Sequence, residues 1–177
     1  MTIHNTNKSS FAIIAFALLL TISIAYSAKA RTSTAAATQD SSVHTIKEAG
    51  LQFEVPKGWK VEEQDNGNVV VSFEDGAASA TFVIEENYAD VIKGMKSGLK
   101  EKLTEMKTEG EPKEDTHNGM THIEENGSGL LKGVKVTWSI DVLKATKNVT
   151  ILTFGIDSVL DAHGPEYAKF VNSIKKI

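Results

Sequence analysis

Residues 134–142 have the sequence V-K-V-T-W-S-I-D-V, in which apolar and polar side chains alternate without a break. Because successive side chains of a strand point to opposite faces of a sheet, this pattern predicts a β-strand with one buried face. Residues 149–156 (VTILTFGI) follow after a turn at Lys147 and Asn148 and are apolar at most positions. Such a segment is typical of a central strand that is covered on both sides. The two segments predict the middle of a mostly antiparallel sheet.

Shorter strands are expected on both sides of this pair in the sequence. In the first half of the chain, turn residues at 56–58, 65–68 and 75–76 separate four strands, at residues 51–55, 59–62, 69–73 and 80–84. In the second half, a strand at residues 120–125 is expected to end at a turn formed by Gly127-Ser128-Gly129. These strands divide into two runs, one before and one after a long helical segment.

Two main helices complete the predicted fold. Apolar residues at three- and four-residue spacing predict a helix over residues 88–109, with Asn87 as its N-cap and a stop at Gly110. A final helix is expected to open at Gly164-Pro165 after one helical turn over residues 158–163. The order ββββ-α-βββ-α predicts an α+β fold in which a sheet of six to seven strands is covered by these helices.

A short motif near the start of the first strand run adds a family resemblance. Residues 51–59 (LQFEVPKGW) place Pro-x-Gly-Trp between two strands, and residues 170–175 (FVNSIK) close the chain. With this element order, the chain resembles the PsbP-like and Mog-type α/β/α sandwich group, which also contains DcrB-type bacterial exported proteins. The resemblance implies an accessory or binding protein more often than an enzyme, and it assigns no site residue.

The first thirty residues have the layout of a secretory signal peptide. Lys8 precedes an apolar run at residues 11–24 (FAIIAFALLLTISI), and Ala28 and Ala30 stand at the −3 and −1 positions of a cleavage site. We expect cleavage after Ala30, with an uncleaved anchor as the alternative, and no permanent membrane span after cleavage. Residues 31–45 are expected to be a flexible tether and residues 46–177 one α+β sandwich domain. The protein is therefore predicted to be secreted or periplasmic.

Composition excludes several classes of function. The chain has no cysteine, so disulfides, zinc–thiolate sites and thiol catalysis are absent. Its net charge of −4 argues against nucleic-acid binding. The sequence has no phosphate-binding glycine loop and no G-x-S-x-G nucleophile motif. No cofactor is expected.

One polar cluster suggests a metal site. Asp115 and His117 precede His122 and Glu124, and the last two share a face if residues 120–125 form a strand. Imidazole and carboxylate groups together can bind a divalent metal ion. A solvated hairpin edge with two ordinary histidines explains the same residues without a metal. His117, His122 and Glu124 are the candidate ligands.

A second candidate site lies on the predicted helix at residues 88–109. Four lysines fall on one flank of its apolar stripe: Lys93, Lys96, Lys100 and Lys107. Such a flank is able to bind an acidic protein or an anionic polymer of the cell envelope. A solvated helix with unoptimised charges is the simpler alternative.

These observations predict an exported, non-catalytic binding or accessory protein of the cell envelope or extracellular space. The alternatives are a metal-assisted hydrolase that uses His117, His122 and Glu124, and a carrier of a small ligand. The sequence leaves open the identity of the partner and the oligomeric state.

Overall fold

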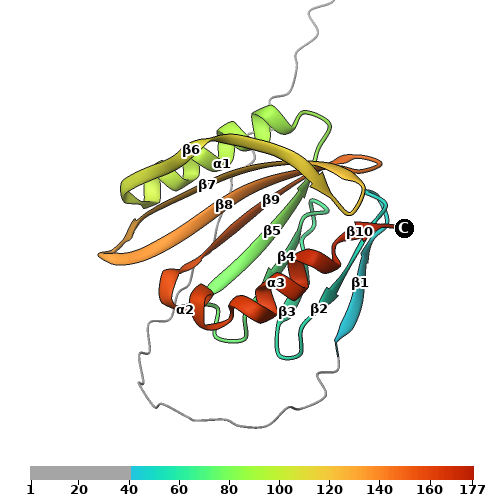
Figure 1. Cartoon of the computed structure of the whole chain (residues 1–177), viewed down its shortest axis with the longest axis horizontal. Helices are drawn as coiled ribbons and strands as arrows, with labels where there is room; N and C mark the ends of the chain where they lie inside the picture. Colours follow the sequence, from blue (N-terminus) through green and yellow to red (C-terminus); the bar gives the residue numbers. More distant parts are fainter. Residues whose placement is uncertain (1–40) are drawn as a thin grey trace, which may run out of the picture.

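The structure is a computed structural model that describes residues 41–177. A large sheet contains β3 (Lys60–Glu63), β4 (Val69–Ser72), β5 (Ala78–Ile84), β6 (Thr104–His117), β7 (Met120–Leu131), β8 (Val134–Lys144) and β9 (Asn148–Ile156). Its order is β3-β4-β5-β9-β8-β7-β6, and all neighbours are antiparallel (Figure 1). A small sheet of order β1-β2-β10 contains β1 (Ser42–Ile46), β2 (Leu51–Val55) and β10 (Lys175–Lys176). The helices are α1 (Tyr88–Lys102), α2 (Asp157–Ala162) and α3 (Gly164–Ser173). The predicted α+β class is confirmed.

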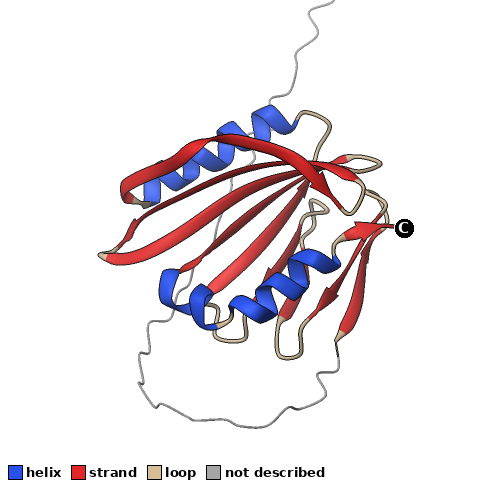
Figure 2. Ribbon diagram, viewed as in Figure 1, coloured by secondary structure: helices blue, strands red, loops and turns tan. Residues whose placement is uncertain are grey.

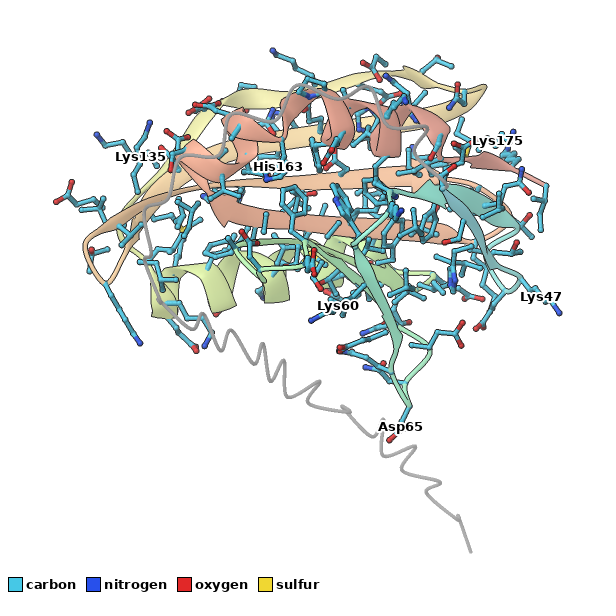
Figure 3. The ribbon with its side chains drawn as sticks, turned by 90° about the horizontal axis from the view of Figure 1, so that it is seen from below. Lys47, Lys60, Asp65, Lys135, His163 and Lys175 are labelled. Carbon is cyan, nitrogen blue, oxygen red and sulfur yellow. The ribbon has the colours of Figure 1, made fainter. Side chains whose placement is uncertain are left out.

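The helices cover opposite faces of the large sheet. In Figure 3, α1 (green) lies on one side of the sheet, and α2 and α3 (red) lie on the other. On the α1 face, Met95 and Leu99 belong to one buried cluster with Trp138 and Ile140 of β8. On the other face, α3 and the small sheet lie side by side and share a second buried cluster with β4, β5 and β9 (Figure 2). The sheet therefore has two separate apolar cores.

The central strands follow the predicted pattern. β9 lies between β5 and β8, and residues 149–155 are buried, as expected for a strand that is covered on both faces. In β8, the apolar residues Val136, Trp138 and Ile140 are buried, whereas Thr137 and Ser139 between them are half-buried. The alternation in the sequence thus corresponds to the two faces of this strand.

Residues 127–129 do not form the expected turn. Gly127, Ser128 and Gly129 lie inside β7, which continues to Leu131. Gly127 pairs with Trp138 of β8, and a Cβ atom at this glycine would lie 2.2 Å from the indole Cζ2 of Trp138 and 2.2 Å from the carbonyl oxygen of Lys107. Gly127 is therefore required because the indole ring occupies the space of a side chain, which explains a glycine inside a strand.

The predicted helix over residues 88–109 is too long. α1 ends at Lys102, Leu103 is extended, and residues 104–117 form β6. β6 and β7 are joined by Asn118 and Gly119, whose φ values of 47° and 76° are those of a type I′ hairpin turn. Pairing with β7 along this hairpin outweighs the helical spacing of the apolar residues.

Two further strands lie where none was expected. Residues 42–45, which the sequence assigned to the tether, belong to β1 and pair with β2 from Ser42 opposite Val55 to Ile46 opposite Leu51. Val43 in this strand is 64% exposed, so β1 lacks the alternation that marks a half-buried strand. β10 is formed by two exposed lysines after α3. Both strands are defined by their pairing with β2 rather than by their own side chains.

β6 is an edge strand with an interruption in its pairing. Its register with β7 shifts between Glu109 and Lys113, and Pro112 lies inside this shift. A proline lacks the N–H group that a regular ladder needs, so it is accommodated where the pairing is broken.

None of the helices within residues 41–177 is both long enough and apolar enough to span a membrane.

Replacing Gly127 tests the contact between this strand and Trp138. We expect Gly127→Ala to lower the free energy of unfolding by about 3 kcal/mol or more, because the new methyl group overlaps both the indole ring and a backbone carbonyl. Gly98→Ala on α1 is the control, since no atom lies within 4 Å of its Cβ position, and we expect this change to stabilise the fold by up to about 1 kcal/mol. Urea unfolding of both variants measures the difference. Equal stabilities would contradict the packing described for β7.

Candidate functional site

A pocket lies between α3 and the face of the large sheet formed by β7, β8 and β9. Its volume is about 260 Å³. The apolar part of its lining comes from both layers and includes Leu143, Ile151, Phe170, Val171 and Ile174. The polar part lies mainly on the strands and comprises His122, Glu124, Asn126, Thr137, Ser139, Asp141 and Thr153, with His117 and Tyr167 beside them. The pocket thus has one apolar side and one polar side.

The alternating direction of the side chains along β7 and β8 places the polar side chains on this face. In β8, Val136, Trp138 and Ile140 belong to the core with α1, so the residues between them point to the face that carries α3. In β7 the same parity applies: Glu125 faces α1, and its two neighbours line the pocket. The register sets Glu124 opposite Asp141 and Asn126 opposite Ser139. Two adjacent rows of polar groups result.

His122 is held by two carboxylates. Its Nδ1 atom lies 2.8 Å from Oδ1 of Asp115 on β6, and its Nε2 atom lies 2.9 Å from Oδ1 of Asp141 on β8. The hydrogen bond to Asp141 is the main cause that raises the pKa of His122 to about 9; Asp115 adds to this rise and burial opposes it. The side chain is therefore an imidazolium at neutral pH, and each ring N–H donates to one carboxylate.

His117 and Asn118 fasten the β6–β7 turn to the end of α3. The Nε2 atom of His117 lies 3.0 Å from the carbonyl oxygen of Val171. The side-chain amide of Asn118 donates to the carbonyl oxygens of Asn172, at 2.9 Å, and Ile174, at 2.7 Å. Carbonyls at a helix C-terminus have no partner within the helix, so the turn caps α3 from outside. This contact fixes one end of the pocket.

Glu124 and Asn126 differ from the other polar residues of the pocket. In the part of the chain that the structure describes, neither side chain has a hydrogen-bond or ion-pair partner. By contrast, the Tyr167 hydroxyl lies 2.9 Å from Oγ1 of Thr153, and burial raises the pKa of Tyr167 to about 12. Glu124 and Asn126 are consequently the polar groups of the pocket that remain available to a ligand.

The three predicted metal ligands do line one pocket, but they are not arranged as a metal site. Among residues 41–177, no group of three or more His, Asp or Glu side chains is placed to hold a metal ion. Both nitrogens of His122 carry protons and donate to carboxylates, so neither offers a lone pair to a metal. Glu125, the next residue after Glu124, lies on the opposite face of the sheet, where it pairs with Lys96 of α1. The geometry favours a charged framework over a metal centre.

The four lysines predicted as a partner surface do not form one helix face. Lys93 and Lys100 are exposed on α1, but Lys107 lies on β6 because the helix ends at Lys102. Lys96 forms an ion pair with Glu125 of β7, whose side chain is 10% exposed. Lys96 therefore holds α1 against the sheet and is not free to bind a partner.

The cleavage-site residues Ala28 and Ala30 lie outside the residues that the structure describes.

Several pocket residues were not identified from the sequence. Thr137, Ser139 and Asp141 form the polar face of the strand that was most clearly predicted, and their shared parity was the available signal. That pattern gives the direction of the side chains but not the helix that covers them. Tyr167 lies in α3, and no motif in the sequence marks its hydroxyl group as part of a site.

The raised pKa of His122 predicts a pH-dependent stability. Since its pKa is about 9 in the folded chain and 6.5 in the unfolded chain, its contribution is complete below pH 6.5 and is lost as the pH rises through 9. We expect a loss of about 2 kcal/mol of unfolding free energy. This loss is smaller than the full change in pKa corresponds to, because Asp115 is exposed and solvent screens its charge. Urea unfolding between pH 6 and 10 should show this loss for the natural protein and not for His122→Gln. Parallel pH profiles would contradict the proposed ion pairs.

Charge reversal distinguishes the lysine of α1 that pairs with the sheet, Lys96, from an exposed lysine of the same helix, Lys100. Lys96→Glu places a second carboxylate beside the buried Glu125, so we expect a loss of about 3 kcal/mol of stability. Lys100→Glu changes an exposed residue and should alter the stability by no more than about 0.5 kcal/mol. Thermal or urea unfolding provides the comparison. If the two variants are equally stable, the pair between α1 and β7 does not hold the helix.

Comparisons with known proteins bear on the fold. No family model matches the sequence, and no curated protein matches it. Among solved structures, the chain is similar to the cyanobacterial PsbP protein, CyanoP, of Synechocystis sp. PCC 6803, with 11% identity, a TM-score of 0.58 and coverage of 83% of this chain and 98% of that chain.

Two weaker similarities were also found. PA94 of Pseudomonas aeruginosa, a protein of unknown function, gives 12% identity, a TM-score of 0.45 and coverage of 75% of this chain and 94% of that chain. LpqN of Mycobacterium tuberculosis, which is involved in cell envelope biogenesis, gives 13% identity, a TM-score of 0.46 and coverage of 79% and 86%. The similarity to CyanoP agrees with the resemblance in residues 51–59, and the chain has a PsbP-like fold.

Proposed function

We propose that this chain is an exported, non-catalytic binding protein, and that it binds a small ligand in the pocket between α3 and strands β7 to β9. The observation that carries the proposal is a pocket of about 260 Å³ whose lining combines an apolar side with two polar side chains that have no partner within residues 41–177. Small-molecule sites typically combine apolar walls with a few such polar groups.

The hydrogen bonds of the pocket support binding rather than catalysis. In a nucleophilic triad, a histidine stands between the serine and the acid and accepts the serine proton. Here the order is different, because Asp141 stands between Ser139, which donates to its Oδ2 atom at 2.8 Å, and His122, which contacts Oδ1. His122 is already protonated and cannot accept a proton from a nucleophile. The polar groups are arranged as a fixed framework.

The walls of the pocket are held in place before any ligand arrives. The C-terminal end of α3 is capped by His117 and Asn118, and its middle is joined to β9 by the hydrogen bond between Tyr167 and Thr153. A preformed site loses less conformational entropy on binding than a site that must be ordered. This rigidity supports the role of a binding protein.

The exported location is proposed on the sequence of residues 1–30. Their basic start, apolar run and Ala28-Lys29-Ala30 ending have the layout of a cleaved signal peptide. The PsbP-like fold is compatible with this proposal, because the group that the chain resembles also contains bacterial exported proteins.

Export is tested by producing the full chain in a bacterial host and measuring the mass of the product in each cell fraction. We expect a soluble product outside the inner membrane that begins at Arg31. Ala30→Leu replaces the small residue at the −1 position and should leave the uncleaved chain in the membrane fraction. A natural chain that keeps residues 1–30, or stays in the cytoplasm, would contradict the proposal.

Binding is tested with a library of small soluble molecules and saturation-transfer NMR. Asn126→Phe should fill the pocket without removing a hydrogen bond, and Thr108→Phe places the same side chain at an exposed position of β6 as a control. We expect molecules whose binding is lost in the first variant and kept in the second. If no molecule shows this difference, the pocket does not bind small ligands and the proposal fails.

A further inference from the structure

We infer that the ligand of this pocket is a small organic cation, with an ammonium group and a short apolar body. This inference rests on the proposed function and adds the chemical class of the ligand. It is carried by the charges that line the pocket, by the two polar groups that have no partner among the described residues, and by the size and apolar character of the opposite wall.

The charges of the pocket leave an excess of negative charge. Of the charged residues that line the pocket, His122 contributes one positive charge and its partner Asp141 one negative charge. Glu124 adds a second carboxylate, and no lysine or arginine within residues 41–177 lines the pocket. Lys113 is opposite Glu124 on the neighbouring strand β6, but it is exposed and forms no ion pair with it in the described structure. A cation is attracted to this pocket and an anion is repelled.

The positions of the acceptors suit an ammonium group. Glu124 and Asn126 are separated by one residue on the same face of β7, so their side chains lie roughly 7 Å apart along the strand. Ser139, opposite Asn126 on β8, is already engaged by Asp141 and Tyr167. An ammonium group has three donors and no acceptor. The carboxylate of Glu124 offers it a charge-assisted hydrogen bond, and the amide oxygen of Asn126 is a second acceptor on the same face.

The opposite wall selects the rest of the ligand. Leu143 and Ile151 of the sheet and Val171 of α3 give an apolar surface beside the polar rows. A volume of about 260 Å³ lies just below the range of about 300–1,000 Å³ that is typical of small-molecule sites. This space fits the body of a small amine. The pocket therefore selects a compact amphipathic cation.

The test compares three probes that share a phenyl ring on a two-carbon chain and differ in the charge of the end group: 2-phenylethylammonium, 2-phenylethanol and 3-phenylpropionate. Binding to the folded chain is followed at pH 7 and low salt by amide chemical shifts of β7 and β8. We expect the ammonium probe to bind at least about tenfold more tightly than the alcohol, and the carboxylate not to bind, because a charge-assisted hydrogen bond is stronger than a neutral one.

Glu124→Gln removes the unpaired charge and keeps the shape of the side chain. We expect it to weaken binding of the ammonium probe about tenfold and to leave binding of the alcohol unchanged. Glu101→Gln on α1 removes an exposed carboxylate outside the pocket and should change neither affinity. Because Glu124 has no intramolecular partner in the described structure, its variant should unfold at the temperature of the natural protein, and this is checked first.

The outcomes separate this inference from the proposed function. Equal affinities for the ammonium and the alcohol, tighter binding of the carboxylate, or no effect of Glu124→Gln on ammonium binding would each overturn the cationic ligand while leaving the pocket as a binding site. If no probe binds although the library yields molecules that Asn126→Phe excludes, the cationic ligand is again overturned. If the library yields none as well, the proposed function fails with it.

Discussion

The contact of three phenylalanines determines where the layers of this protein meet. Phe53 of the small sheet stacks on Phe82 of the large sheet, with ring centroids 4.9 Å apart, and Phe170 of α3 meets Phe53 edge to face at 5.5 Å. All three rings are fully buried, so the contact combines a large apolar area with favourable ring geometry. Because it joins both sheets and the helix at one point, it sets the height of α3 above β9. The pocket exists because α3 is held there while polar side chains occupy the sheet beside it.

The polar side of the pocket is a second constraint on the fold. It opposes the burial that the phenylalanine contact favours, because this side contains charged groups. Burying a charged group is costly unless another charge and hydrogen bonds compensate it, and His122 meets this condition with Asp115 and Asp141 on the two neighbouring strands. The same carboxylate of Asp141 also accepts a hydrogen bond from Ser139. β6, β7 and β8 are thus joined by side chains as well as by their backbones. These side-chain bonds hold the register of the three strands at the pocket, where an apolar core is missing.

The sequence was sufficient for the parts of the fold that local patterns control. The alternation in residues 134–142 correctly gave a strand with two different faces, and the apolar run after it gave the central strand. Local patterns failed where long-range pairing decides. The first part of β6, residues 104–109, was assigned to a helix because the helical spacing of apolar residues continues through Leu103 and Met106, although Asn118-Gly119 is a hairpin signal. The turn expected at Gly127 failed for the same reason, since the Trp138 ring that requires this glycine lies on another strand.

The candidate site was predicted in part. His117, His122 and Glu124 were selected as one cluster, and they do line one pocket. Their roles differ from the prediction, because the partner of His122 on β8 and the carbonyl of Val171 bound by His117 come from distant parts of the chain. No pattern within residues 115–125 contains that information.

The break in the pairing of β6 has a consequence for the behaviour of this protein at high concentration. A long strand at the edge of a sheet exposes backbone groups that a neighbouring molecule is able to pair with, which is a common start of aggregation. On β6, Pro112 presents no N–H group to such a neighbour, and the charged residues Glu111 and Lys113 flank it. The irregular segment thus protects the open side of the sheet, so that an extended surface of fourteen residues does not become a template for fibril growth.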